Sequence, residues 1–249
     1  MTDQQYRVMS VDPCATLPDI PGAGGTTADR LYVVLEEAII DRSLPPGTHL
    51  KAESLCRRYG VSMIPVRESL RTLQANGWVD IKPHHGAFVI SGTESEVADL
   101  YEARIVLETA ASAMAAQRRT DDDLRLLDAA VAAGTDIVTS GALGDFARLN
   151  SLFHERVTEA THNSTLIVVQ RRLSQRVRFY SSVLTMDRVQ SSVEEHAALV
   201  EAIRNRDPDT ARSVAQEHIG ESRAKVAERL PVKPAPRRGS GRIEATHPA

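Results

Sequence analysis

A change of pattern at Ser91-Gly92-Thr93 divides the chain into two parts that must fold in different ways. Before this tripeptide, apolar residues repeat at helical spacing in short segments, and two strand-like runs, 78–81 and 87–90, predict a hairpin. After it, every segment has a helical pattern: about 94–118, 121–139, 144–161, 163–185, 187–205 and 207–229. The pattern predicts a mainly α protein, with an N-terminal module over 27–91 and an antiparallel all-α bundle of about six helices over 94–230.

Both ends of the chain are rich in residues that interrupt helices and strands. Residues 1–26 hold three prolines and a Gly-rich run at 22–25, which predicts a disordered leader. Several prolines and the pair Arg237-Arg238 lie within 231–249, which predicts a disordered, mildly basic tail. This tail is either a solvated end or a segment that touches phosphate groups.

The composition excludes several classes of protein. A net charge of −3 argues against a protein that coats nucleic acid indiscriminately, although a local basic patch is compatible with it. The two cysteines, Cys14 and Cys56, lack metal-type or redox-type neighbours, so we expect a reduced protein without a disulfide framework. No run of about 18 apolar residues and no N-terminal signal pattern is visible. We therefore expect a cytoplasmic protein without a membrane span.

The N-terminal module has the order of elements of a winged helix. A helical pattern over 31–39 is followed by a short helix over about 52–59 and by a third helix that Ser62 caps. Asn76-Gly77 ends the third helix, and the predicted hairpin follows. Helix, helix–turn–helix and hairpin in this order predict that the third helix enters the major groove of DNA.

The third helix carries basic residues away from its buried face. Arg67 and Arg71 lie one turn apart, on a different face from the apolar Val66 and Leu70. From residue 51 to residue 82 there are six basic and three acidic side chains, a local charge of +3 in a negatively charged chain. Arginine can form two hydrogen bonds to guanine. Charge alone leaves open whether these residues contact DNA or are ordinary solvated side chains.

Several short motifs in this module resemble the DNA-binding domain of the GntR family. They lie in the family's order at 44–50, 59–62, 65–70, 76–79 and 85–89. The resemblance covers about residues 28–90 and implies a bacterial transcription regulator that binds a pseudo-palindromic operator as a homodimer. The operator sequence of relatives does not transfer, because Met63 stands where the family usually has Arg.

The resemblance also indicates which residues approach DNA. Family members use the serine before the third helix, the arginine of a PVRE-type motif and the wing glycine, which match Ser62, Arg67 and Gly86. His85 occupies a wing position that often carries Arg or His. Helical phase adds Arg71 to this set of predicted DNA-binding residues.

Three histidines in the C-terminal half lie on the apolar faces of three different predicted helices. They are His154, His196 and His218. Neutral imidazoles are good ligands for divalent transition metals, so three together indicate a metal site. An inward histidine can equally be a hydrogen-bonded core residue, and both interpretations stay open. His162 falls off the inward face and is not expected to be a ligand.

The C-terminal half resembles the FCD effector domain that accompanies GntR winged helices. The matching residues are Arg104 with Leu107-Glu108, Asn150 with Phe153-His154, 160–163, Glu195-His196 with Ala202-Ile203, Asp207, Ala211 and His218-Ile219. The resemblance covers about residues 94–229. It implies a site for zinc, nickel or a similar ion at Asn150, His154, His196 and His218. The neutral Asn150 is a weaker ligand than the Asp of many relatives.

Two arginines share faces with apolar residues on the predicted bundle helices. Arg104 lies on a face with Leu107, and a buried arginine needs a partner. That partner is either Glu108, in an internal salt bridge, or the carboxylate of an effector, as the FCD resemblance implies. Arg176 also lies on an apolar face and is a second candidate for binding that effector.

Together these features predict a ligand-responsive transcription regulator, a repressor, that senses a small organic acid at a metal-containing site. A metal-free sensor, in which the histidines only line a polar cavity, is an alternative. A metal-dependent enzyme is another, since an open metal site can activate water. The sequence has no HExxH arrangement, no Gly-rich phosphate loop and no Ser-His-Asp set, and Glu155 directly follows His154 and so points elsewhere. We therefore expect a protein that is not an enzyme.

Overall fold

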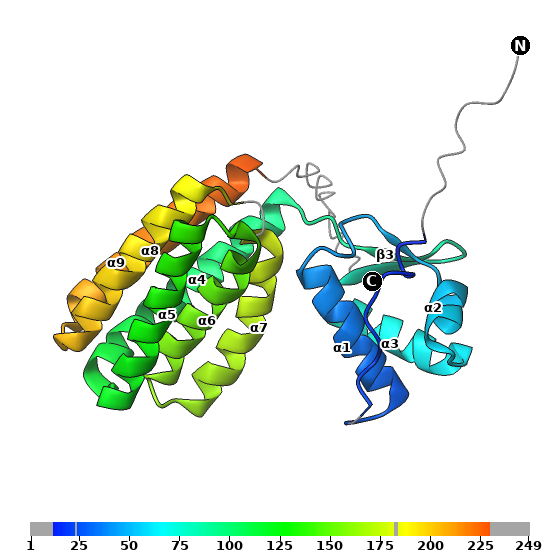
Figure 1. Ribbon diagram of the computed structural model, residues 1–249, viewed down its shortest axis with the longest axis horizontal. Helices are drawn as coiled ribbons and strands as arrows, with labels where there is room; N and C mark the ends of the chain where they lie inside the picture. The colour runs from blue at the N-terminus through cyan, green and yellow to red at the C-terminus, as the bar shows by residue number, and fades with distance from the viewer. Residues whose placement is uncertain (1–11, 23, 182–183, 230–249) are drawn as a thin grey trace, which may run out of the picture.

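The structure is a computed structural model that describes residues 12–22, 24–181 and 184–229 (Figure 1). The predicted tail and residues 1–11 of the predicted leader lie outside these ranges. The described chain forms the two expected parts, a winged helix and a helical bundle. Within these ranges, no helix combines the length and apolar character needed to cross a membrane.

The winged helix comprises three helices and a three-stranded antiparallel sheet. Its elements are α1 (Thr27–Ile40), β1 (His49–Leu50), α2 (Ala52–Tyr59), α3 (Met63–Ala75), β2 (Val79–Lys82) and β3 (Gly86–Val89). The central strand is β3, with β1 on one side and β2 on the other, and Asp80 lies opposite Phe88. The predicted winged helix is confirmed. The sequence does not predict β1, because two residues show no periodicity.

Cap and turn residues set the boundaries of these helices. The Thr26 hydroxyl accepts from the N–H of Asp29, and the Asp29 carboxylate accepts from the N–H of Thr26, so a capping box begins α1. Gly60 ends α2 at φ 63°, and Gly77 takes φ 67° between α3 and β2. Glycine adopts this left-handed region without steric cost, so the chain turns directly from α3 into the hairpin.

Six α-helices and one short 3-10 turn make up the described bundle. They are α4 (Glu94–Arg118), α5 (Asp121–Ser140), η1 (Leu143–Asp145), α6 (Phe146–Glu159), α7 (Ser164–Ser181), α8 (Met186–Arg204) and α9 (Pro208–Arg229). Capping boxes from Thr93 to Glu96 and from Thr120 to Asp123 begin α4 and α5. The six predicted helices are confirmed within a few residues of their expected ends.

The bundle and the winged helix meet through α7, which lies on the side of the bundle that faces α1 (Figure 1). The buried Trp78, directly after α3, meets the ring of Phe179 edge-on with 5.9 Å between centroids. Arg42 donates from Nε and Nη2 to the carbonyl of Phe179 at 3.2 and 3.0 Å. Arg178 forms an ion pair with Glu37 of α1. One hydrophobic core therefore continues from the winged helix into α7.

Residues 12–22 form an N-terminal strap that packs against the winged helix. The side chains of Cys14 and Leu17 are 1% and 3% exposed, within the same core as α1 and α2. Arg58 of α2 donates to the carbonyl of Leu17 and forms an ion pair with Asp19 at 3.0 Å. The predicted disordered leader does not hold for this segment, because burial of two apolar side chains keeps an otherwise irregular chain in place.

The substitution Leu17→Ala is expected to lower the free energy of unfolding by about 2–4 kcal/mol, because it removes buried methyl groups and leaves a cavity. Urea denaturation followed by circular dichroism measures this change. Leu126→Ala on α5 is the matched control, since Leu126 is 45% exposed. Its loss should cost less than about 0.5 kcal/mol. Equal effects of the two substitutions would show that the strap does not contribute to the core.

Candidate functional site

Four of the five predicted DNA-binding residues surround one groove between α3 and the hairpin. Arg67 and Arg71 line it from α3, and His85 and Gly86 line it from the wing. Ser62 is the N-cap residue of α3 and lies outside this groove, and its exposed hydroxyl makes no capping hydrogen bond. The fold therefore collects the predicted residues around the exposed side of α3.

The groove carries several cationic or ionisable side chains. In the described part of the chain, the side chains of Arg67 and Arg71 make no hydrogen bond or ion pair with protein. Lys51, His49 and His84 also line the groove. The sequence did not single out the two histidines, because only the fold brings β1 and the wing turn beside α3. Free guanidinium groups on an exposed helix are suited to phosphate or base contacts.

Gly86 allows the wing to pass close to β1. Its φ is 89°, a conformation that favours glycine. A Cβ atom at this position would lie 2.6 Å from Nε2 of His49. The ring of His49 is itself stacked on Phe88 with 4.5 Å between centroids, so it has little freedom to move away.

The three inward histidines meet in the middle of the bundle. His154 of α6, His196 of α8 and His218 of α9 are 5%, 4% and 2% exposed. One ring nitrogen from each lies within 4.8 Å of the others. The Nε2 atoms of His154 and His218 are 3.2 Å apart. We call these three residues the histidine cluster; the fold brings together the side chains that helical phase had singled out.

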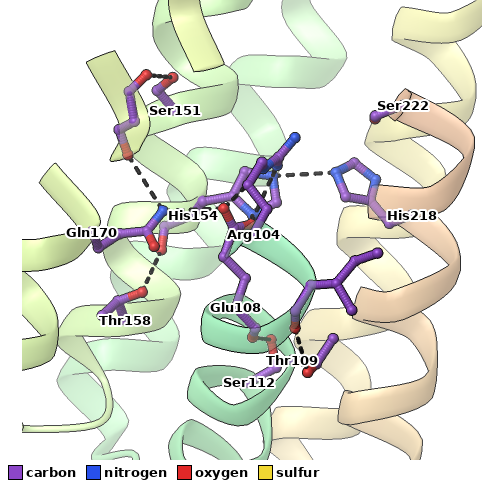
Figure 2. Close-up of polar contacts among 12 residues, drawn as sticks. Arg104, Glu108, Thr109, Ser112, Ser151, His154, Thr158, Gln170, His218 and Ser222 are labelled. Atoms are coloured by element: carbon purple, nitrogen blue, oxygen red, sulfur yellow. Dashed lines mark hydrogen bonds and ion pairs between the residues drawn. The ribbon is translucent and has the colours of Figure 1, made fainter. Parts of the chain in front are cut away.

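A buried ion pair on α4 contacts the Nδ1 side of the His154 ring (Figure 2). Arg104 donates from Nε and Nη2 to the two oxygens of Glu108 at 2.9 and 3.2 Å. The Oε2 atom of Glu108 lies 2.9 Å from Nδ1 of His154. Figure 2 shows Gln170 of α7 approaching the same group, with its Nε2 3.4 Å from Oε1 of Glu108. The Oε1 atom of Gln170 is buried and has no partner within the described chain.

A second ion pair holds His218 in the same way. Arg188 donates to both oxygens of Glu195 at 2.9 and 2.8 Å, and Oε2 of Glu195 lies 2.6 Å from Nδ1 of His218. Arg188 also donates to the carbonyl of His218 at 3.1 Å and to Oγ of Ser222 at 2.9 Å. Sequence reasoning missed Arg188. Its spacing of seven residues from Glu195, two helical turns on one face, was the available signal.

These carboxylates decide which ring nitrogen carries the hydrogen. A carboxylate accepts hydrogen bonds, so Nδ1 of His154 and of His218 is the donor and each Nε2 is left as an acceptor. Two acceptor Nε2 atoms then face each other at 3.2 Å. The Nε2 atom of His196 is buried and has no partner among the described residues. Among the described residues, the donor Nη2 of Arg104 approaches Nε2 of His154 at 3.5 Å, and a cation between the three rings would satisfy the nitrogen atoms that no protein donor reaches.

A proton is poorly suited to be that cation. Burial, followed by the neighbouring His218 and His154, holds the pKa of His196 well below its ordinary value. Burial, followed by His154 and Arg104, does the same to the pKa of His218. Burial alone would raise the pKa of Glu108, but Arg104 and His154 outweigh it and hold that pKa well below its usual range. His196 and His218 thus present neutral imidazoles, beside the ionised carboxylate of Glu108.

The donor set fits a divalent transition metal. Two nitrogen ligands of a tetrahedral zinc, with bonds of about 2.0–2.1 Å, lie roughly 3.3 Å apart. The separation between Nε2 of His154 and Nε2 of His218 is 3.2 Å. Asn150 lies one turn before His154 on α6 and is 6% exposed, so its amide oxygen is the fourth candidate ligand. Imidazole donors suit both zinc and nickel.

Arg104 is paired inside the protein, which was one of its two expected roles. Its side chain is almost fully buried, and the Glu108 carboxylate outweighs burial and raises its pKa. Its Nη2 atom also lies 3.5 Å from Nε2 of His154. Arg104 therefore borders the side of the histidine cluster on which a metal ion or an effector would lie.

The structure does not bring Arg176 to the histidine cluster. Its guanidinium stacks on the ring of Trp78 at 4.0 Å and donates to the carbonyl of Asn76, the residue that caps α3 at its C-terminal end. Helical phase groups the residues that share a face but does not say what that face packs against.

His162, not expected to be a ligand, is half exposed and lies 3.0 Å from Asp123.

Known proteins of this architecture are transcriptional regulators. The chain is 27% identical to the galactonate operon transcriptional repressor of Escherichia coli K12, over 80% of this chain and 96% of that protein. It is 24% identical to the uncharacterized HTH-type transcriptional regulator YdhC of Bacillus subtilis, over 76% of this chain and 86% of that protein. A GntR transcriptional regulator from Rhodococcus sp. RHA1 shares the fold, with a TM-score of 0.71 and 18% identity over 81% of this chain and 97% of that one.

Two family models match the two parts of the chain. Residues 27–89 match the model of bacterial regulatory proteins of the gntR family, and residues 99–221 match the model of the FCD domain. The protein therefore belongs to the gntR family. It is a transcriptional regulator with an FCD domain and not an enzyme.

The metal-free protein is expected to lose stability as the pH falls below 6.5, the ordinary pKa of histidine. The unfolded chain then binds protons at His196 and His218 that the folded chain disfavours, because burial lowers both pKa values. The slope should approach about 1.4 kcal/mol per pH unit for each histidine. Urea denaturation with a chelator, at several values between about pH 7.5 and pH 5, measures it.

The variant His196→Gln provides the comparison for this titration. Removing one of the two titrating imidazoles should reduce the slope by about half. A wild-type stability that does not change over this pH range would contradict the expected neutral state of His196 and His218.

Proposed function

We propose that this protein is a ligand-responsive repressor that binds a pseudo-palindromic operator as a homodimer and senses a small organic acid at a metal-containing site. The position of α7 is the observation that carries the proposal. Gln170 of α7 reaches Glu108 beside the histidine cluster, and Arg176 of the same helix holds the end of α3. A ligand at the cluster and the DNA-facing helix would therefore act on one rigid element.

The operator-binding surface would consist of the residues around the α3 groove. Arg67, Arg71 and His85 would contact DNA through their side chains, and Ser62 would meet a phosphate at the N-terminus of α3. Gly86 would let the wing backbone approach DNA closely. The unpaired state of both arginines supports this assignment, because other arginines of the chain are engaged in ion pairs. Two copies related by a two-fold axis would read the two half-sites.

The sensor site would hold zinc or nickel at Asn150, His154, His196 and His218. The neutral donor set leaves the positive charge of the ion in place, and a bound ion of this kind attracts and polarises a carboxylate. Arg104, beside His154, is a candidate contact for an organic acid. Two relatives are named as repressors of the galactonate operon and the gluconate operon. Both names refer to hydroxy acids, which supports this effector class.

Elemental analysis of protein purified without a His tag should find about one zinc or nickel ion per chain, the stoichiometry of a single set of ligands. The variant His196→Ala should retain almost none. Asn150→Asp should bind the ion more tightly in a chelator competition, because a carboxylate is a stronger ligand for a dication. Glu195→Gln should weaken binding by about 10–100-fold, since the carboxylate orients His218.

A metal content near zero, with retained binding of an organic acid, would instead favour a metal-free sensor in which the histidines only line a polar cavity. Unchanged metal affinity in His196→Ala would exclude the proposed ligand set. Glu201→Gln on the exposed side of α8 is the matched control for Glu195→Gln.

The contacts of α7 describe how a ligand at the cluster would change DNA binding. Gln175 donates to Glu36 of α1 at 3.3 Å, and Glu36 accepts from Nε1 of Trp78 at 2.8 Å. Trp78 and Asn76 lie in the turn that ends α3, and Arg176 contacts both. A displacement of α7 would thus be transmitted to the DNA-facing helix. The effector must bind the DNA-competent and DNA-free states unequally for this to regulate anything.

Arg176→Ala is expected to uncouple the effector from DNA binding. The probe DNA is a duplex that the full-length protein isolates from a random pool. The effector is the sugar acid that most raises the melting temperature in a panel of hydroxycarboxylates. In the wild-type protein this acid should lower DNA affinity by about 5–150-fold. In Arg176→Ala this ratio should approach one, because α7 no longer holds the α3 turn.

Arg172→Ala, one turn earlier on α7 and exposed, is the control and should keep the wild-type ratio. Metal content should be the same in all three proteins. A full wild-type ratio in Arg176→Ala would rule out this contact as the coupling element.

A further inference from the structure

Ile64 is an exposed apolar side chain at the beginning of the DNA-facing helix. It is the second residue of α3 and is 69% exposed, whereas Val66, Leu70 and Leu73 of the same helix are at most 6% exposed. An isolated exposed apolar residue has no functional meaning by itself. The position of Ile64 on the DNA-facing side of α3 does indicate a function for this residue.

Ile64 shares this face with the two unpaired arginines. Residues three and seven positions further along a helix lie on the same side, and these positions are Arg67 and Arg71. All three side chains are exposed, opposite the stripe that packs into the core. Glu68, also exposed, lies on the same side. Ile64 is therefore the exposed apolar residue at the N-terminal end of this charged helix face, where the neighbouring Met63, four positions before Arg67, is only partly exposed.

The first turns of a recognition helix are the part that meets base edges in the major groove. The only apolar group that a base pair presents there is the C5-methyl group of thymine. The isoleucine side chain has no hydrogen-bonding atom and can recognise a base edge only by such contact. Arginine, by contrast, recognises guanine through O6 and N7.

We propose that Ile64 is a specificity-determining residue that reads the C5-methyl group of a thymine in each operator half-site, beside the bases that Arg67 or Arg71 contacts. The proposal rests on DNA binding through the α3 face. It assigns to this chain a thymine preference at one position, which charge and groove shape alone would not produce.

Replacement of thymine by uracil tests the proposal, because it removes only the methyl group. The full-length protein first isolates a duplex from a random pool, and each thymine of that duplex is then replaced in turn by deoxyuridine. For the wild-type protein, at least one replacement per half-site should weaken binding by about fourfold, the value of one buried methyl-sized group. For Ile64→Ala the same replacement should have no effect.

Two further variants make the test specific. Ile64→Val keeps an apolar β-branched side chain and should keep the sensitivity to uracil. Leu126→Ala changes an exposed apolar residue of α5, far along the chain from α3, and should match the wild-type profile. The salt dependence of binding should be the same in all four proteins, because none of the changes removes a charge.

The outcomes distinguish a failure of DNA recognition by the α3 face from a failure of the role assigned to Ile64. If the wild-type protein enriches no sequence from the pool, both DNA recognition by the α3 face and the role of Ile64 are overturned. If it enriches a sequence but is insensitive to every uracil, or if Ile64→Ala keeps the wild-type profile, only the role of Ile64 is overturned.

Discussion

The buried ion pair between Arg104 and Glu108 is the interaction on which the centre of the bundle depends. Both residues are at most 3% exposed, and charges in such a place are tolerated only when each satisfies the other. The pair holds the Glu108 carboxylate against Nδ1 of His154, which leaves Nε2 of that ring to face His218. Arg188 and Glu195 impose the same order on His218. The two ion pairs thus orient the rings of His154 and His218 so that their Nε2 atoms face each other.

The same ion pair also links the histidine cluster to the winged helix. Glu108 contacts Gln170 on α7, and less than two turns further along this helix Arg176 holds the turn after α3. Trp78 belongs to the core of the winged helix and yet packs against Arg176 and Phe179 of α7. The two parts matched by separate family models are therefore joined through a shared, well-packed helix rather than through a flexible linker.

Much of this arrangement could be predicted because it is encoded locally. Helix lengths follow from periodicity and caps, and the inward direction of His154, His196 and His218 follows from helical phase. Phase also places Arg104 and Arg176 on apolar faces, but it cannot tell the centre of the bundle from the contact with the winged helix. Residues 12–22 had no recognisable pattern, because an irregular segment has no periodicity. The burial of Cys14 and Leu17, which holds this segment against the core, depends on the tertiary fold.

The sequence by itself determined the helices and strands of the winged helix and of the bundle, the basic face of α3 and the inward direction of three histidines, because each depends on local spacing along the chain. Only the tertiary structure decided that Arg188 and Glu195 lie behind His218, that Gln170 reaches Glu108 and that Arg176 closes the turn after α3. Most of these contacts join residues that are tens of positions apart in the chain. They depend on how helices pack, and no local pattern encodes that.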